Sequence, residues 1–203
     1  MEKYTKIDTK EQEMSECWQL FKAGNRQAFA QIYEYYIDKL YNYGSHFVAD
    51  NDLVKDAIQE LFIDIWRIRE NLADTTSVKY YLFRSLRRKL RLMTESMSVF
   101  VELPDTDFNE FLPNTFSHES ELIEQETKQS QIVLLQKYLP QLPPRQFEAI
   151  RLSFFDGFSL KEVAAIMEMN EQSVRNLIQR SLKHLRQLVS TIVSLLFFFS
   201  KIF

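Results

Sequence analysis

The sequence predicts an all-α protein made of two small helical domains joined by an acidic linker. Three glycines and five prolines in 203 residues leave few positions for the tight turns of β-hairpins. Hydrophobic residues make up 45% of the chain and aromatic residues 14%, which is enough to bury a core. Apolar residues also recur at helical spacing in several segments, so the pattern favours helices over a sheet.

The N-terminal domain, expected at 16–96, contains a helix that follows Gly24 and Asn25. Its apolar residues recur at i, i+3, i+4, i+7, i+8 and i+11, the spacing of a buried helical stripe. They are Phe29, Ile32, Tyr33, Tyr36, Ile37 and Leu40. The stripe predicts that one face of this helix packs into the core of the domain.

A second helix is expected from Asn51 to about Arg69. Its apolar residues are predicted to point inward: Leu53, Val54, Ala57, Ile58, Leu61, Phe62, Ile65 and Trp66. Its largely outward face carries three acids and an amide: Asp56, Gln59, Glu60 and Asp64. Such a face is usually solvated, and the alternative is a docking surface for a partner.

A polar loop at 70–77 precedes a third helix, expected from Val78 to about Met93. Residues 79–92 hold six basic residues and no acid, interleaved with Tyr80, Tyr81 and Phe83. Cationic side chains bind phosphates and aromatic rings stack on unpaired bases, so this composition is typical of single-strand nucleic-acid binding. We expect some of the three rings to be core residues and at most one to stack on a base.

Charge is segregated along the chain, although the net charge is only −3. Residues 95–126 contain nine acids and no Lys or Arg. Helical periodicity is lost in this region, and Pro104 and Pro113 interrupt it, which predicts a partly flexible linker at 97–121. The description that fits best is two basic surfaces separated by an acidic connector.

The second domain is expected at 122–190. Residues 122–139 can form a helix, and the pair Pro143-Pro144 is suited to start another one. Asp156-Gly157 is expected to end that helix. A helix-turn-helix pattern follows immediately.

The helix-turn-helix pattern spans Ser159–Arg186. Ser159 and Glu162 form an S-x-x-E capping box at the start of its first helix, and Asn170 is suited to cap the second. In the second helix one side is apolar, and the other carries amides and cations that suit a DNA major groove. The candidate DNA-reading residues are Gln172, Ser173, Arg175, Asn176, Gln179, Arg180 and Lys183. The alternative is an ordinary amphipathic hairpin with a solvated basic face.

Three segments, in this order, resemble the sigma-70 family of bacterial RNA polymerase initiation factors, specifically its small extracytoplasmic-function (ECF) group. They are DAIQELFIDIW at 56–66, SVKYYLFRSLRR at 77–88 and LPPRQFEAIRLSFFDGFSLKEVAAIM at 142–167. The resemblance covers about 20–95 and 130–188. It implies an alternative sigma factor that binds core RNA polymerase and directs it to promoter DNA.

The resemblance gives each surface a role. The outer face of the second helix (Asp56, Gln59, Glu60 and Asp64) would bind a coiled coil of the polymerase β′ subunit. The loop at 70–77 and the basic helix would open the minus-10 element through Lys79, Tyr80, Arg84, Arg87, Arg88 and Arg91. The helix-turn-helix would read the minus-35 element.

Two residues depart from the family pattern. Arg88 stands where the family often has Asn. An arginine can still contact a phosphate at this position, but a base-specific contact there is less expected. Glu168 stands in the turn where Gly is common, so a non-glycine residue is expected in a strained left-handed conformation.

We expect no catalytic site, cofactor, metal or small-molecule substrate. The single cysteine, Cys17, and His46, His118 and His184 make no metal-ligand pattern. The polar N-terminus is unlike a signal peptide, so a cytoplasmic protein is expected. The resemblance also implies an anti-sigma partner, commonly membrane-bound, that would hold the protein inactive near the inner membrane.

The C-terminal tail, 191–203, has nine residues from Val, Ile, Leu and Phe and a single charge, Lys201. It is too short to span a bilayer, which needs about 20 apolar residues. Three roles remain open: packing on a core, binding a partner, or touching a membrane. Two other functions also remain open for the whole chain, a free-standing helix-turn-helix regulator and a membrane-associated interaction protein.

Overall fold

The computed structural model describes residues 2–73, 75, 77–96 and 139–199, and every regular element among them is a helix. The chain divides into two compact units, Met1–Pro104 and Asp105–Phe203. The all-α prediction is therefore confirmed. The linker expected at 97–121, and the helix expected at 122–139 except for its last residue, lie outside the described residues.

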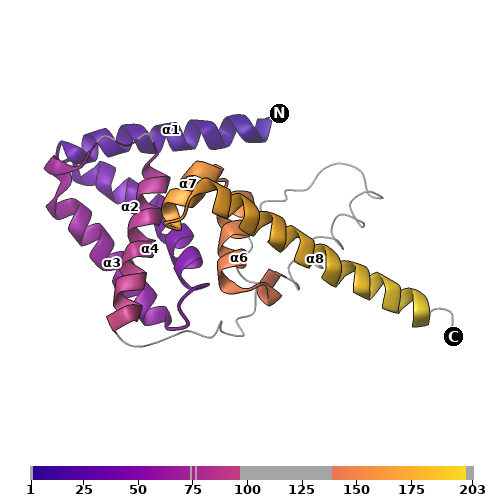
Figure 1. The fold of residues 1–203 in the computed structure, drawn as a ribbon. Helices are drawn as coiled ribbons and strands as arrows, with labels where there is room; N and C mark the ends of the chain where they lie inside the picture. The colour runs from indigo at the N-terminus through magenta and orange to yellow at the C-terminus, as the bar shows by residue number, and fades with distance from the viewer. Residues whose placement is uncertain (1, 74, 76, 97–138, 200–203) are drawn as a thin grey trace. The chain divides into compact units, whose positions relative to one another are not determined.

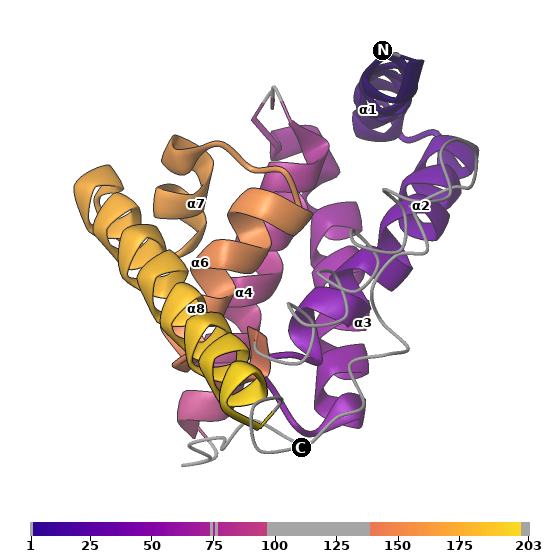
Figure 2. The same ribbon diagram turned by 90° about the vertical axis from the view of Figure 1, so that its right-hand side faces the viewer.

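Four α-helices and a short 3₁₀ turn form unit 1 (Figure 1). Helix α2 packs against α1, α3 and α4, and α3 packs against α4, as Figure 2 shows from a second side. Asn25 and Asp50 cap α2 and α3 through their side-chain oxygens. The elements are α1 (Glu2–Lys22), α2 (Arg26–Gly44), α3 (Asn51–Arg67), η1 (Arg69–Asn71) and α4 (Val78–Ser96).

Helix α1 comes before the first helix expected from the sequence, and it begins at Glu2, ahead of the domain start expected at residue 16. Its buried residues, Met14, Trp18 and Phe21, are spaced i, i+4 and i+7. The Trp18 ring centroid lies 5.2 Å from that of Phe21 and 5.2 Å from that of Tyr81 on α4. A few large aromatic residues thus fix the helix in the core, although most of its sequence is polar.

Helices α2 and α3 approach closely at Gly44. A Cβ placed there would lie 2.7 Å from Val54 Cγ1 and 3.3 Å from Leu90 Cδ1. Gly44 therefore allows α2, α3 and α4 to meet at one point.

Tyr36 on α2 is also buried. Its hydroxyl donates to Glu11 Oε2 at 3.0 Å, and burial, with the nearby Glu11 carboxylate, raises the pKa of Tyr36.

Unit 2 contains the helix-turn-helix. Its described elements are η3 (Leu139–Gln141), α6 (Pro144–Ile150), the π-helical turn η4 (Arg151–Phe155), α7 (Leu160–Ile166) and α8 (Glu171–Phe199). The predicted capping box at Ser159 and Glu162 is present, and the Ser173 N–H donates to the Asn170 side chain at 2.7 Å. Both predicted caps are confirmed.

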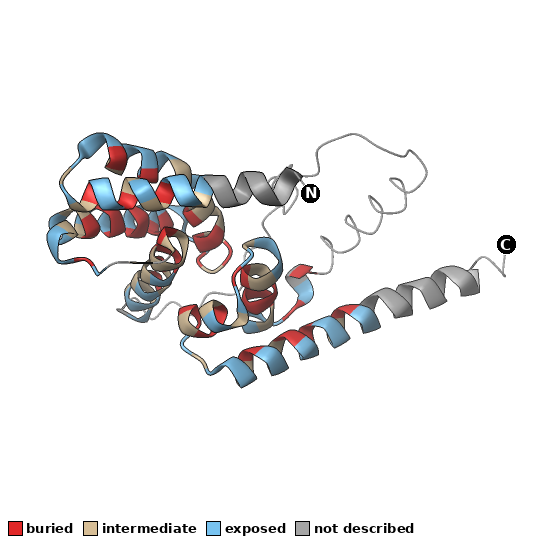
Figure 3. Ribbon diagram, turned by 90° about the horizontal axis from the view of Figure 1, so that it is seen from above, coloured by how far each residue is buried: buried red, intermediate tan, exposed pale blue. Residues whose placement is uncertain are grey.

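Helix α8 packs on α6 and α7 along one stripe of its surface (Figure 3). The buried positions are Val174, Ile178, Ser181 and Leu185, spaced i, i+4, i+7 and i+11. The helix then continues to Phe199, so the tail residues up to that point extend the recognition helix without a break. The last four residues, 200–203, lie outside the described part of the chain.

Candidate nucleic-acid interfaces

Helix α4 separates a core face from a cationic stripe. Leu82, Phe83, Leu86 and Leu90 are buried. A step of about 100° per residue places Tyr80, Arg84, Arg87 and Arg91 within an arc of roughly 60° on the other side. Arg84, Arg88 and Arg91 are exposed, and Lys79, Tyr80 and Arg87 are half-buried. From Tyr80 to Arg91 the stripe is about 16 Å long, at 1.5 Å per residue.

Of the three aromatic residues on α4, Tyr80 is the one available to a ligand on the cationic stripe. Phe83 is fully buried and stacks near Tyr43, with ring centroids 5.0 Å apart. Tyr81 is half-buried against Trp18, and this burial raises the pKa of its hydroxyl. The Tyr80 hydroxyl accepts a hydrogen bond from Arg84 Nη1 at 3.2 Å, which joins a ring and a cation in one unit.

The start of α4 is fixed by local hydrogen bonds. The Tyr80 N–H donates to Ser77 Oγ at 3.1 Å, and the Ser77 N–H donates to Thr75 Oγ1 at 3.2 Å. Serine in this position satisfies a backbone donor at the helix N-terminus. The described part of the loop at 70–77 therefore holds Tyr80 at the first turn of the helix.

Lys89, one of the six basic residues of α4, points away from the stripe and toward α3. Its ammonium lies 2.9 Å from Glu60 Oε2 and 3.0 Å from Asp64 Oδ2. The hydrogen bond from Lys89 lowers the pKa of Asp64, with further help from Arg67 at 2.8 Å. Two of the four predicted polymerase-binding residues thus also link α3 to α4, which the sequence pattern did not reveal.

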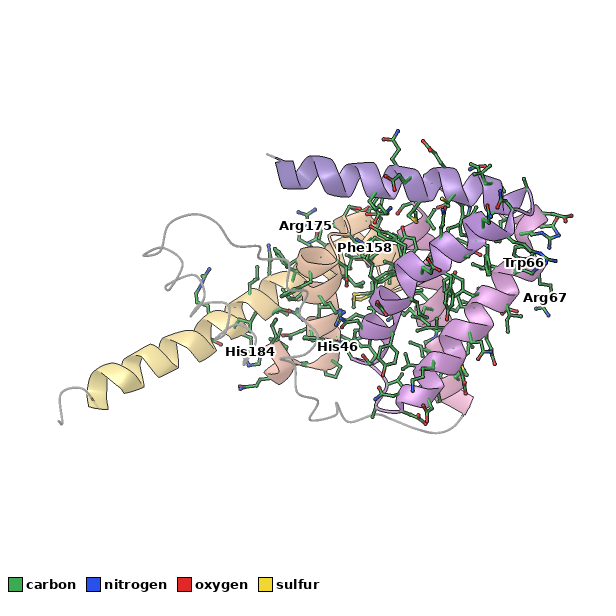
Figure 4. All side chains as sticks on the ribbon, turned by 180° about the vertical axis from the view of Figure 1, so that it is seen from behind. His46, Trp66, Arg67, Phe158, Arg175 and His184 are labelled. Carbon is green, nitrogen blue, oxygen red and sulfur yellow. The ribbon has the colours of Figure 1, made fainter. Side chains whose placement is uncertain are left out.

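The outer face of α3 is more apolar than the sequence predicts. Asp56 and Gln59 are exposed as expected, but so is Ile63, at 55%. Gln59 borders a surface groove of about 500 Å³ between α2 and α3, lined by Arg26, Phe29, Tyr33, Gln59, Phe62, Ile63 and Trp66. Figure 4 shows Trp66 and Arg67 at one end of α3.

The groove shows that part of the predicted core was wrong, because three residues expected inside are only partly covered. Phe29, Tyr33 and Trp66 were expected inside, yet Tyr33 is 40% exposed and the other two are half-buried. Helical periodicity shows which side of a helix is apolar, but it does not show how much of that side the neighbouring helix covers. The large number of aromatic residues on both helices was the sequence feature that could have indicated an incompletely covered apolar surface.

The residues predicted to read DNA lie along the surface of α8 that faces away from α6 and α7. Gln172, Arg175, Asn176, Gln179, Arg180 and Lys183 are exposed, and Ser173 is half-buried beside the Asn170 cap. Gln172 Nε2 donates to Asn176 Oδ1 at 3.0 Å, so these amides support each other on one turn of the helix. Figure 4 labels Arg175 on this part of α8.

The turn before α8 contains the strained residue expected from the sequence. Glu168 has φ of 54°, and it is the only non-glycine residue with positive φ in the described part of the chain. Left-handed backbone places Cβ close to the following carbonyl, so a residue other than Gly costs about 1–2 kcal/mol there. The turn is formed at some expense of stability.

Within the described residues, no group of three or more His, Cys, Asp or Glu side chains could hold a metal ion. The same residues include no helix long and apolar enough to cross a membrane.

Two family models match the chain, one in each unit. Residues 32–92 match sigma-70 region 2, and residues 132–185 match sigma-70 region 4. The first range contains α3 and α4, and the second contains the helix-turn-helix. The chain belongs to the sigma-70 family. A free-standing helix-turn-helix regulator is the less favoured reading, because region 2 is matched as well.

Relatives place this sigma factor in the ECF group. It is 24% identical over 158 residues to the RNA polymerase sigma factor SigZ of Bacillus subtilis, covering 78% of this chain and 85% of SigZ. It is 24% identical over 161 residues to the ECF RNA polymerase sigma factor SigM of the same organism, covering 78% and 93%. It is an alternative sigma factor, a class of protein that generally regulates transcription and is not enzymatic.

A solved structure shares the fold. The sigma factor RpoE, determined in complex with the anti-sigma factor NepR from Bartonella quintana, superposes with a TM-score of 0.53 at 21% identity. The match covers 80% of this chain and 96% of RpoE. It agrees with the division into two helical units.

Proposed function

We propose that this sigma factor uses three separate helical faces for three steps of initiation. The outer face of α3 docks on a coiled coil of the polymerase β′ subunit. The stripe on α4 holds the opened minus-10 strand, and the outer face of α8 reads the minus-35 element. The observation that carries this assignment is that each face is exposed or half-buried, while the apolar side of the same helix is buried.

The polymerase contact centres on Gln59 and the groove beside it. Asp56 has no ion pair within the described residues, and Gln59 is an exposed neutral amide, whereas Glu60 and Asp64 are engaged by Lys89. An apolar hollow bordered by exposed polar side chains is the usual anatomy of a protein interface. Glu60, which is 56% exposed, follows Gln59 on α3 and remains accessible to a partner, and Asp64 serves mainly to hold α3 against α4.

Promoter opening rests on α4. Arg84, Arg87, Arg88 and Arg91 would neutralise successive phosphates along the stripe, while Tyr80 stacks on an unpaired base. Lys79 lies one helical position before the tyrosine and adds charge at the start of the stripe. No step requires a catalytic group or cofactor of this protein, and none is proposed.

Regulation by an anti-sigma factor is proposed for this chain as well. RpoE, which shares the fold, forms a complex with the anti-sigma factor NepR. The groove on α2 and α3 and the exposed Ile63 give such a protein an apolar surface to cover. A membrane-bound partner would hold this sigma factor in the cytoplasm near the inner membrane until it is released.

Run-off transcription with purified core polymerase on a genomic library tests the proposal. We expect transcripts that require both core and this protein, starting downstream of shared minus-10 and minus-35 elements. Tight sequence-specific binding to DNA by the free protein, without any core-dependent transcript, would show a conventional regulator.

Charge reversal tests the polymerase face. Asp56→Lys combined with Gln59→Lys should lower affinity for core by at least tenfold, because two cations replace the acid and the amide of the proposed contact. The control is the exchange Asp52→Lys with Lys55→Asp on the same helix, which keeps opposite charges at the two positions that form an ion pair in the native protein. Equal affinity of both variants for core, with unchanged thermal unfolding, would place the polymerase contact elsewhere.

A further inference from the structure

One lysine of α4 forms a fork with two acids of α3. Lys89 Nζ lies 2.9 Å from Glu60 Oε2 and 3.0 Å from Asp64 Oδ2. The Lys89 side chain is 20% exposed, whereas the side chains of the Lys55–Asp52 pair on α3 are 62% and 87% exposed. Solvent and salt therefore screen the fork less than they screen a surface ion pair.

The fork restrains α4 both along and around its axis. Glu60 and Asp64 are one helical turn apart, about 6 Å along α3, and a single ammonium donates to both. Sliding or rotation of α4 would lengthen at least one of these two hydrogen bonds. The apolar residues buried between α3 and α4 (Figure 2) attract without direction, whereas charge-assisted hydrogen bonds require a defined geometry. Lys89 therefore adds a directional constraint that apolar packing lacks.

The fork and the cationic stripe lie on opposite sides of α4. Lys89 comes nine residues after Tyr80, which at about 100° per residue places it half a turn away around the helix. A rotation of α4 by about 20° moves side-chain atoms that lie about 6 Å from the axis by roughly 2 Å. Hydrogen bonds to phosphate oxygens span only about 2.7–3.2 Å. A small rotation is therefore enough to break the contacts that the stripe would make.

We propose that Lys89 is a positioning residue for strand binding: by holding both acids of α3, it orients the stripe of α4 toward the opened minus-10 strand. Lys89 does not touch the DNA itself. Glu60 follows Gln59 on the outer face of α3, so the fork also keeps the proposed polymerase face and the stripe in a fixed relation. This role of Lys89 rests on the proposed function of α4 in holding the strand.

Binding of a fluorescent single-stranded minus-10 oligonucleotide to the holoenzyme, with core polymerase at saturating concentration, tests the proposal. Lys89→Met keeps the length of the side chain and removes its charge. It should weaken strand binding by about tenfold, the effect of losing one charge-assisted hydrogen bond, while core affinity stays within about twofold of wild type. Lys89→Arg can bond both carboxylates and should restore strand binding to the wild-type level.

The matched control is Lys55→Met. It removes a lysine whose ion pair, to Asp52 at 2.9 Å, lies within α3, so strand binding should not change. A role of Lys89 in stability alone would lower the melting temperature of Lys89→Met and leave strand binding by the folded holoenzyme unchanged. That result would overturn the proposal, as would an equal loss of strand binding in the control.

Asp64→Asn separates positioning from direct contact. This variant removes the charge of one partner and leaves Lys89 in place, so a positioning role predicts weaker strand binding. Stronger binding would show that the released lysine contacts a phosphate, and it would overturn the proposal. If the wild-type holoenzyme does not bind the strand, the proposed function of α4 is wrong and the role of Lys89 with it. Normal binding by both the wild type and Lys89→Met overturns only the role of Lys89.

Discussion

Helices α4 and α8 both present a basic outer face above a buried apolar one, but different side chains accompany the charge. On α4 the cations stand beside Tyr80, with no amide side chain from Val78 to Ser96. On α8 the amides Gln172, Asn176 and Gln179 lie among the cations. Arginine next to an aromatic ring is suited to bind single-stranded DNA, whereas amides are suited to hydrogen-bond base edges in the major groove. This difference is the basis of our proposal that α4 holds an opened strand and α8 reads sequence.

The two helices also differ in how they are held. Lys89 ties α4 to the acids of α3, while Arg91 pairs with Glu95 at 3.4 Å on α4 itself. The cations of α8 at 175, 180 and 183 form no ion pair with another described residue. Phosphate binding by α8 therefore displaces no internal partner of these cations.

The largest effect is expected from removing charge on α4. Arg84→Gln combined with Arg88→Gln should weaken holoenzyme binding to a single-stranded minus-10 oligonucleotide by about 3 kcal/mol, if each charge-assisted bond contributes about 1.5 kcal/mol. The loss should be equal for all sequences, and the salt dependence should flatten by about 0.7 per lost phosphate contact. Fluorescence anisotropy across a salt series measures both. A loss confined to one sequence would make α4 a base reader.

Substitutions of Tyr80 distinguish the contribution of base stacking from that of charge. Tyr80→Ala should cost about 1–3 kcal/mol in binding the opened strand, because a base loses its stacking partner. Tyr80→Phe keeps the ring and should lose much less binding free energy, although Arg84 then lacks its hydroxyl acceptor. The same anisotropy assay serves here, and equal loss in both variants would mean that the hydroxyl, not the ring, carries the contact.

On α8 the amides and the lysine should behave differently. Asn176→Ala should reduce discrimination between matched and mismatched minus-35 elements by about 1–2 kcal/mol with an unchanged salt slope. Lys183→Gln is the paired control. It should weaken binding to all DNA sequences alike, and it should reduce the slope of log affinity against log salt concentration by about one. Competition binding of holoenzyme to duplex promoters reports both values. Identical behaviour of the two variants would remove direct base reading from this face.

Glu168→Gly should stabilise unit 2 by about 1 kcal/mol, because the left-handed turn no longer carries a Cβ. Glycine also loses more conformational entropy on folding, which keeps the gain small. Thermal unfolding measures the change, and Glu171→Gly, placed in the first turn of α8, is the control that should destabilise. A lower melting temperature for Glu168→Gly would show that its side chain stabilises the turn.

The smallest effect concerns pH. The pKa of Asp64 is lowered in the folded protein, so its link to Lys89 stabilises at neutral pH and is lost as pH falls below about 4, the unfolded value. The carboxylate is 40% exposed, so the contribution is below about 1 kcal/mol. Urea unfolding between pH 7 and pH 3 should show a slightly weaker pH dependence in Lys89→Met. An identical dependence in both proteins would mean that the ion pair adds nothing to stability.

Local features of this chain were predictable and long-range ones were not. The caps at Ser159 and Asn170 and the stripe on α8 follow from neighbouring residues, and all are present. The left-handed Glu168 was expected from the resemblance to the family, which often has Gly there, and it is present as well. The Lys89 link to α3 joins residues 25 and 29 positions apart, which helical periodicity does not encode.

The groove on α3 was missed for a related reason. Trp66 reads as a core residue by spacing, yet α2 covers it only in part. Helix α1 was not predicted, because three large buried residues in a polar segment give a weak periodic signal. In both cases the deciding quantity is the area covered by a neighbouring helix, which becomes known only once the helices are assembled.

Promoter opening tests the division of labour between α4 and α8 most directly. A promoter identified by run-off transcription is labelled with 2-aminopurine in its minus-10 element, whose fluorescence rises when bases unstack. With core polymerase at saturating concentration, the wild type and Asn176→Ala should give the same opening signal, and Arg84→Gln with Arg88→Gln should give little. Full opening by the double arginine variant, or opening by the free protein without core, would contradict the account.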